Sequence, residues 1–253
     1  MRSVLTIAGS DSSGGAGIQA DLRTFAALGV HGATAITAIT AQNAQGVSAI
    51  ETLSADMVTA QIEAAASGLA LHATKIGMLA NAAIAEAVAA AIDDLELPLV
   101  VLDPVLASTS GTRLLDNDGV QVLLLELLPR VLVVTPNVPE AEALSGRRIT
   151  SPATARDAAK RLHDAGAAHV IVKGGHMHAD GSPSEVVDLL YDGHDFVELR
   201  VARVSHDRGP TVRGTGCSHA SAVAAFLALG RTLPDAAAEA QRHVASLVRG
   251  VRL

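Results

Sequence analysis

The feature that most constrains the fold of this chain is the alternation of short, β-branched apolar runs with longer segments of helical periodicity. The runs expected to form strands are 4–8, 34–40, 99–102, 131–134 and 170–172. The segments expected to form helices are 21–28, 82–95 and 154–165. In 82–95 the apolar residues recur at three- and four-residue spacing, which is typical of a helix with one buried face. Such alternation predicts an α/β fold with a doubly wound, mostly parallel sheet.

The pattern changes late in the chain. Residues 186–191 and 196–204 read as strands, and Asp192-Gly193 between them is a dipeptide favoured in tight turns. This segment predicts an antiparallel hairpin. A glycine-rich loop at 214–216 and a helix at about 218–229 follow it. Because no linker rich in proline, glycine or serine divides the sequence, we expect one domain over residues 1–253.

Composition agrees with this architecture and argues against several partners. Apolar residues make up 49% of the chain but aromatic residues only 2%, so the core must be aliphatic, which suits a sheet covered on both faces by alanine-rich helices. A net charge of -7 without a cluster of basic residues argues against nucleic acid. No apolar run reaches the roughly 20 residues of a membrane span, and the first residues do not resemble a signal peptide. We therefore expect a cytoplasmic protein that does not bind membranes.

Two polar clusters follow the first predicted strands, at the strand ends where doubly wound sheets bind ligands. The glycine-rich segment 9–17 lacks the lysine of a P-loop and the downstream acidic residue of a dinucleotide site. It is either a tight turn with positive φ or a loop that lets a flat substrate approach the backbone. Gln42 carries an amide that can pair with the edge of a heteroaromatic ring or simply face water.

Acidic and basic side chains follow the later strands. Asp103 and Glu140, with Asn137 nearby, can hold Mg²⁺ beside phosphates, directly or through water. Glu140 also suits the first turn of a helix, where it would complement the helix dipole. Lys173 could reach a nucleotide phosphate or be a solvated loop lysine.

The most informative cluster is Arg213-Gly214-Thr215-Gly216-Cys217, which leads into an apolar helix. Its small residues leave backbone N–H groups free at a helix N-terminus, which predicts a compact anion site. We expect the positive potential there to lower the pKa of Cys217, the single cysteine, although a lone cysteine can also be a small core residue. A metal site, an anion site and a base together predict phosphoryl transfer.

Seven segments occur in the order and at the spacing of one family. They are 6–21, 41–43, 75–79, 103–105, 135–141, 173–176 and 214–217. From about residue 3 to 230, the chain resembles the hydroxymethylpyrimidine/phosphomethylpyrimidine kinases of the ribokinase-like superfamily. The resemblance implies a three-layer αβα sandwich, usually a homodimer. It also implies ATP, Mg²⁺ and the phosphorylation of 4-amino-5-hydroxymethyl-2-methylpyrimidine and its monophosphate in thiamine biosynthesis.

The resemblance also implies roles by position. The pyrimidine pocket would be lined by Gln42, Asp21, Gly9 and Met78. Nucleotide contacts would come from Asn137, Lys173 and Thr215. The metal would be served by Asp103 and Glu140. The catalytic anion hole would be formed by Gly214, Gly216 and Cys217, and Cys217 would stand where sugar kinases of the superfamily carry a catalytic aspartate.

The chain departs from the family pattern just before this anion hole. Val212 and Arg213 replace a Thr-His pair that is frequent there, which removes a hydroxyl and adds a charge. Two alternatives stay open. Pyridoxal kinases share the fold and some carry a cysteine at the same place, but the 41–43 motif favours the pyrimidine. A non-catalytic pyrimidine sensor is the other alternative, against which the intact anion site argues.

Overall fold

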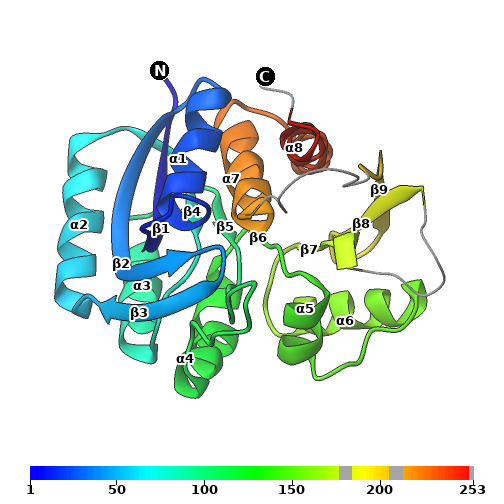
Figure 1. Ribbon diagram of the computed structural model, residues 1–253, viewed down its shortest axis with the longest axis horizontal. Helices are drawn as coiled ribbons and strands as arrows, with labels where there is room; N and C mark the ends of the chain where they lie inside the picture. The colour runs from blue at the N-terminus through cyan, green and yellow to red at the C-terminus, as the bar shows by residue number, and fades with distance from the viewer. Residues whose placement is uncertain (177–183, 205–212, 251–253) are drawn as a thin grey trace.

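The computed structural model describes residues 1–176, 184–204 and 213–250 (Figure 1). Among these residues, nine strands form one sheet in the order β3-β2-β1-β4-β5-β6-β7-β8-β9. The strands are β1 (Ser3–Asp11), β2 (His31–Asn43), β3 (Gly46–Thr52), β4 (Leu71–Ile76), β5 (Val100–Leu102), β6 (Val133–Val134), β7 (Val170–Val172), β8 (Glu185–Tyr191) and β9 (Phe196–Ala202).

Helices connect most of the strands. They are α1 (Gly17–Ala27), α2 (Ala55–Gly68), α3 (Ala82–Asp94), α4 (Asn117–Val122), α5 (Val138–Ser145), α6 (Pro152–Asp164), α7 (Thr215–Ala228) and α8 (Leu233–Val248). A π-helical turn at Leu123–Leu127 and a 3-10 turn at Leu128–Arg130 extend α4, and another 3-10 turn at Gly174–His176 follows β7.

The sheet is parallel from β2 through β7 and antiparallel at both edges. β3 pairs antiparallel with β2, and β8 and β9 form the antiparallel hairpin at the other edge. The predicted mostly parallel sheet with a late hairpin is therefore confirmed. The early β2–β3 pair was not predicted, because the residues of β3 are mostly exposed and carry no apolar alternation.

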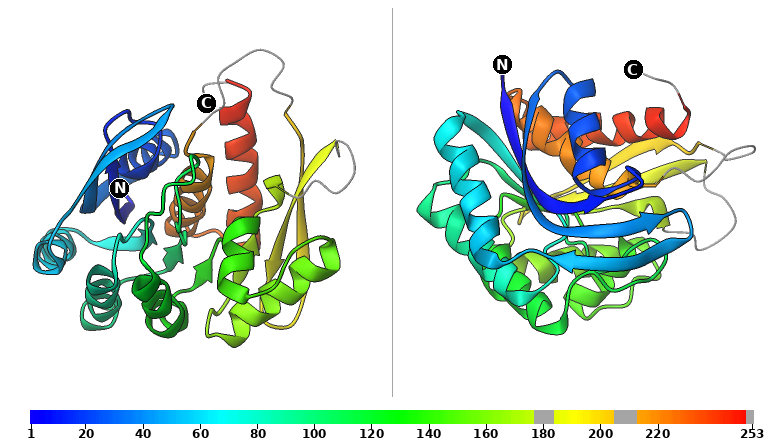
Figure 2. Two further views of the ribbon diagram at one scale, coloured as in Figure 1. Left: turned by 60° about the horizontal axis from the view of Figure 1, so that its bottom comes forward. Right: turned by 60° about the vertical axis from the view of Figure 1, so that its left-hand side comes forward.

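Helices cover both faces of the sheet, giving the expected three layers (Figures 1 and 2). Successive strand residues point to opposite faces, so Leu5 and Ile7 join one core cluster while Val4 joins the other. The first cluster packs under α2, α3, α5 and α6, and the second under α1, α7 and α8. Both cores are almost wholly aliphatic, with Phe25 as the one buried phenylalanine of the second.

The carboxyl ends of the parallel strands share one edge with the start of α7. The strand ends at this edge lead to Asp11, Asp103 and Lys173, and the glycine-rich segment before α1 lies beside them. Within the described ranges, no helix has both the length and the apolar character that crossing a bilayer requires. The edge formed by these strand ends is where the candidate site is built.

Candidate active site

Gly214 joins the loop before α7 to the glycine-rich segment after β1. It is the N-cap of α7 and has a φ of 74°, a left-handed conformation that favours glycine. A Cβ on Gly214 would come within 2.3 Å of the carbonyl oxygen of Gly15, so a side chain cannot be accommodated there. The two glycines thus allow the backbones of residues 15 and 214 to touch, although they are far apart in sequence.

The first turn of α7 points at a lysine–aspartate pair. No side chain caps the helix, so its first N–H groups are available to an anion. Thr215 is the first helical residue, and a Cβ on Gly216 would lie 3.4 Å from Nζ of Lys173 and 4.0 Å from Oδ2 of Asp103. The absence of a side chain at Gly216 therefore opens space between the helix start and the ion pair.

Lys173 and Asp103 form a nearly buried ion pair at the ends of β7 and β5. Nζ of Lys173 donates to Oδ1 of Asp103 over 2.7 Å. Burial alone would raise the pKa of Asp103, but Lys173 and Lys75 together hold it below its usual range. Burial opposes the charge of Lys173 as well, yet Asp103 and Glu140 raise the pKa of this lysine. Both side chains are therefore charged at neutral pH.

Glu140 lies beside this pair and caps α5. Its Oε2 accepts from the N–H of Asn137 over 2.8 Å, while its own N–H donates to Oδ1 of Asn137 over 2.9 Å. This capping box shows that Glu140 does complement the start of a helix. Burial raises the pKa of Glu140 to about 7; Lys173 opposes the rise and Asp103 adds to it. The metal and nucleotide roles of Glu140 and Asn137 stay predictions.

The donor set agrees with a metal that is shared with a substrate. Within the described part of the chain, no group of three or more His, Cys, Asp or Glu residues could hold a metal ion by itself. Asp103 is close enough to Glu140 to add to the rise of its pKa, although burial is the main cause of that rise. Mg²⁺ is commonly held by one or two carboxylates together with phosphates and water, and these two residues fit that mode.

A second ion pair lies deeper. Lys75 and Asp21 are both fully buried, and Nζ of Lys75 lies 2.9 Å from Oδ2 of Asp21. The hydroxyls of Thr6 and Ser221 each donate to Asp21 over 2.7 Å. Burial would lower the pKa of Lys75, but Asp21, Cys217 and Asp103 together raise it above its usual range. Asp21 thus joins β1, β4, α1 and α7, and its predicted contact with the substrate stays a prediction.

Cys217 lies on the first turn of α7, partly buried, with the N–H of Gly17 directed at its sulfur. Burial raises the pKa of its thiol to about 11, Asp103 and Asp21 add to the rise, and the nearby Lys75 opposes it. The expectation that the helix N-terminus lowers this pKa is therefore wrong, because the cost of removing a thiolate from water is larger. In this state Cys217 is a thiol at neutral pH.

The residues predicted to line the pyrimidine pocket fall in two places. Gly9 packs against Met78, because a Cβ on Gly9 would lie 2.9 Å from the Met78 sulfur. Gln42, partly exposed, lies across the glycine-rich segment, where its N–H donates to Oγ of Ser12 over 3.0 Å. Its side-chain oxygen accepts from Oγ1 of Thr40 over 3.0 Å. The contact between Gln42 and a ring stays a prediction.

Sequence reasoning assigned no role to Asp11, which organises the glycine-rich segment. Asp11 is buried and accepts from the N–H and Oγ of Ser13 and from the N–H of Ala16 over 2.8–2.9 Å. An aspartate followed two residues later by serine is a common turn signature, so the sequence did contain a signal. The Asp11 carboxylate therefore fixes the loop that faces α7.

The family profile described as Phosphomethylpyrimidine kinase matches residues 11–252. The thiamine biosynthesis bifunctional protein ThiED of Geobacter sulfurreducens is 44% identical over 98% of this chain, which spans 49% of that protein. The hydroxymethylpyrimidine/phosphomethylpyrimidine kinase of Rhizobium meliloti is 47% identical over 95% of this chain and 89% of that protein.

Two solved structures are similar throughout. The phosphomethylpyrimidine kinase from Clostridium difficile 630 has a TM-score of 0.84 and 35% identity, covering 98% of this chain and 100% of that chain. The pyridoxal kinase from Staphylococcus aureus in complex with AMP-PCP and pyridoxal has a TM-score of 0.86 and 35% identity, covering 98% of this chain and 88% of that chain.

Proposed function

The chain belongs to the phosphomethylpyrimidine kinase family, and we propose that it transfers the γ-phosphoryl group of ATP to 4-amino-5-hydroxymethyl-2-methylpyrimidine and then to the resulting monophosphate. The observation that carries this proposal is the meeting of the uncapped start of α7 with the Lys173–Asp103 pair. Backbone N–H groups and a lysine supply the positive charge that a transferring phosphoryl group requires.

The residues divide into three roles around that point. The N–H groups at Gly214, Thr215 and Gly216 would hold the transferring phosphoryl group. Lys173 would contact the nucleotide phosphates and Asn137 would lie beside them. Asp103 and Glu140 would hold Mg²⁺, which when bound neutralises the charge of the phosphates.

The acceptor would lie on the other side of α7. The Met78 sulfur packs against the backbone of Gly9. A flat ring would lie beside this contact, and Gln42 would pair with the ring edge. Cys217, at the start of α7, would face the hydroxymethyl group and take its proton. Since the thiol of Cys217 is neutral in this state, proton removal would require its ionisation when the substrates bind.

A substrate panel tests the proposal. The protein is incubated with ATP and Mg²⁺ together with the hydroxymethylpyrimidine, its monophosphate or pyridoxal, and ADP release is measured with the product identified by phosphorus NMR. We expect turnover of the first two at kcat/KM at least about tenfold above pyridoxal, as the 41–43 motif indicates. Preference for pyridoxal would assign the chain to that related activity, and absence of ADP release with every acceptor would leave a ligand sensor.

Three further features are proposed from the resemblance. We propose that residues 1–253 act as one kinase domain, that the protein is a homodimer and that it works in the cytoplasm. Sedimentation of the purified chain tests the second of these directly.

A further inference from the structure

Arg213, the residue just before the N-cap of α7, reaches across to the glycine-rich segment. Its Nη1 donates to Oγ of Ser13 over 3.1 Å, and its Nη2 lies 3.5 Å from Oδ2 of Asp11. A Cβ on Gly15 would lie 3.4 Å from the same Nη1. The guanidinium therefore lies over the loop on the acceptor side of the site, next to the proposed anion hole.

The contact with Asp11 is long, so it neutralises little of the charge of Arg213. Asp11 already accepts three hydrogen bonds of 2.8–2.9 Å from its own loop, so the 3.5 Å approach of Arg213 is the longest of its contacts. The side chain of Arg213 keeps 20% of its surface exposed, against 3% for Asp11. A guanidinium has five N–H donors, and most of them have no short contact here within the described ranges.

The two lysines of the site each form a short ion pair. Lys75 is fully buried against Asp21 at 2.9 Å, and Lys173 is held by Asp103 at 2.7 Å. Lys173 lies on the side where the nucleotide phosphates are proposed to bind, whereas Arg213 lies beside the acceptor loop. Of these three cations, Arg213 is therefore the one available to a second negative charge on the acceptor side.

The two proposed phosphorylations place different demands on this side. In the first, the acceptor is a neutral hydroxyl, and its proton must be removed as its oxygen bonds to the γ-phosphorus. In the second, the acceptor is a phosphate monoester, which is largely a dianion at pH 7.5 because its second pKa is about 6. One of its oxygens bonds to the γ-phosphorus while the bond to the bridging oxygen breaks and ADP leaves. This step needs no base, but it brings two anions together.

We propose that Arg213 is the specificity-determining residue for the charged acceptor: its guanidinium binds the phosphate of the monophosphate substrate and offsets its repulsion from ATP. Arginine suits this task because its planar donors match phosphate oxygens in pairs. The inference rests on the proposed function and deepens it, because it concerns the second phosphorylation alone.

The experiment compares the two steps in Arg213→Gln. Initial rates are measured separately with the hydroxymethylpyrimidine and with its monophosphate, at saturating ATP and Mg²⁺. Loss of a charge-assisted contact is expected to lower kcat/KM for the monophosphate by about 10- to 100-fold more than for the neutral acceptor. The KM for the monophosphate should rise while the KM for ATP stays within about twofold. Arg213→Lys, which keeps the charge, should recover part of the loss.

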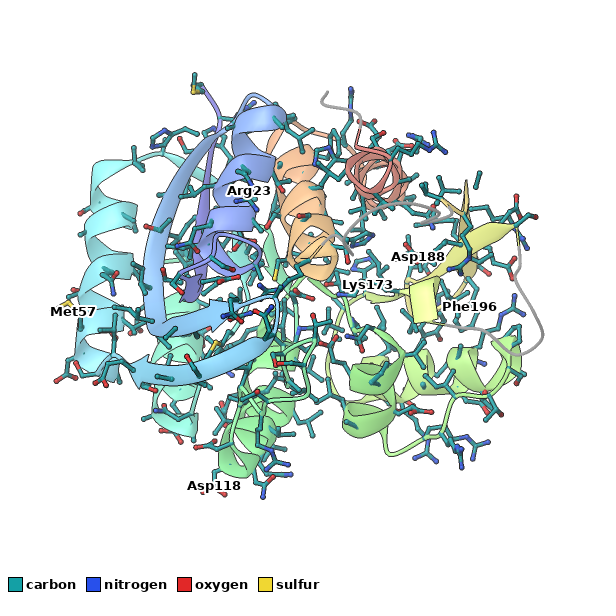
Figure 3. The ribbon with its side chains drawn as sticks, viewed as in Figure 1. Arg23, Met57, Asp118, Lys173, Asp188 and Phe196 are labelled. Carbon is teal, nitrogen blue, oxygen red and sulfur yellow. The ribbon has the colours of Figure 1, made fainter. Side chains whose placement is uncertain are left out.

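Two control variants separate charge at the site from effects on the loop. Arg23→Gln removes an exposed guanidinium of α1 (Figure 3), whose Nη1 would lie 3.6 Å from a Cβ on Gly14 of the same loop. Ser13→Ala removes the hydrogen bond from Arg213 to Ser13 but keeps the charge of Arg213 and its approach to Asp11. We expect each control to change both steps by the same factor.

Several outcomes would overturn the proposal. Equal losses in both steps with a raised KM for ATP would place Arg213 on the nucleotide or in the fold, and an unchanged ratio would leave it without a role. A selective loss in Arg23→Gln would show that the effect is long-range charge. Wild-type protein that phosphorylates the neutral acceptor but not the monophosphate would remove this inference while leaving the kinase function in place.

Discussion

The substitution Cys217→Ala tests how the acceptor hydroxyl loses its proton. With a thiol pKa of about 11, the ionised fraction of Cys217 at pH 7.5 is about one in 3000, and it rises about tenfold with each pH unit. If the thiolate is the base, the rate of the first phosphorylation should follow that fraction. Log kcat/KM, which reports the ionisation of the free enzyme, should then rise with a slope near one between pH 7 and 10.

The assay is the first phosphorylation in wild type, Cys217→Ala and Cys217→Asp, measured from pH 6 to 10. Cys217→Ala keeps the backbone N–H, so the Kd for ATP should change little while turnover falls about 100-fold or more, the usual scale for loss of a general base. The alkaline rise should vanish in this variant. Cys217→Asp should recover part of the activity and lose the rise, because the ordinary pKa of an aspartate carboxyl group, about 4, is far below that of a thiol.

Alkylation gives the same pKa by an independent route. The rate of reaction with iodoacetamide should rise about tenfold per pH unit up to about pH 11, and the pyrimidine substrate should protect. If Cys217→Ala turns over at the wild-type rate with the same pH profile, the thiol is only a small helix residue. Asp21 would then be the next base to test, although all its hydrogen-bond partners would have to rearrange first.

Three further predictions follow from the described contacts. Gln42→Ala should raise the KM for the pyrimidine by roughly 5- to 150-fold, the equivalent of about 1–3 kcal/mol for an unpaired buried partner, in steady-state assays. EDTA should abolish activity, Asp103→Asn and Glu140→Gln should each raise the Mg²⁺ requirement, and in wild type this requirement should increase as pH falls through about 7, where Glu140 gains a proton. Lys75→Met should lower the free energy of unfolding by about 3–5 kcal/mol in urea titrations, because it strands the buried carboxylate of Asp21.

Matched controls make each of these results specific. Gln45→Ala removes a neighbouring amide that is exposed, and it should leave the pyrimidine KM unchanged; a KM unchanged in Gln42→Ala as well would remove that residue from the pocket. Full turnover in metal-free buffer would exclude the metal role. The double variant Asp21→Asn/Lys75→Met should be more stable than Lys75→Met alone. Equal stabilities of the two variants would contradict the explanation that the loss in Lys75→Met comes from an unpaired buried carboxylate.

The sequence predicted most strands of the parallel core, because there the pattern and the packing agree, but it missed β4 (Leu71–Ile76) and α2 (Ala55–Gly68). The helix expected at 82–95 is α3, Ala82–Asp94, since its apolar spacing and the cap at Asn81 point to the same boundaries. β3 was missed because its residues are largely exposed. α8, which follows the predicted elements, was missed too, and its buried Gln241 donates to backbone carbonyls of β8 and β9. The sequence nevertheless carries signals for α8, because Thr232 caps the helix and Pro234 stands in its first turn.

The site was predictable where it depends on strand ends. Parallel strands end at one edge, so Asp103 and Lys173 were expected to lie near the start of α7, and they do. Partnerships that join distant segments could not be read from spacing: Lys75 meets Asp21 from 54 residues away, and Ser221 meets Asp21 from 200. The predicted direction of the pKa shift of Cys217 was wrong for the same reason, since that pKa depends on how tightly those segments enclose the sulfur.

The pairing of Lys173 with Asp103 links nucleotide binding to the metal. The phosphates of ATP must compete with Asp103 for Nζ of Lys173, and a carboxylate 2.7 Å away makes that lysine a weaker phosphate ligand. If Asp103 turns to a metal instead, Lys173 is released to the phosphates, so Mg²⁺ and ATP should strengthen each other's binding.

Asp103→Asn removes the competing charge without removing the lysine. Calorimetry in EDTA should therefore show that metal-free ATP binds about tenfold more tightly to Asp103→Asn than to wild type, which corresponds to about 1.4 kcal/mol of binding free energy that the ion pair costs. The variant should nevertheless turn over more slowly with Mg²⁺. Lys173→Met should weaken metal-free binding in both backgrounds. Equal affinities of wild type and Asp103→Asn for metal-free ATP would show that the pair does not restrain Lys173.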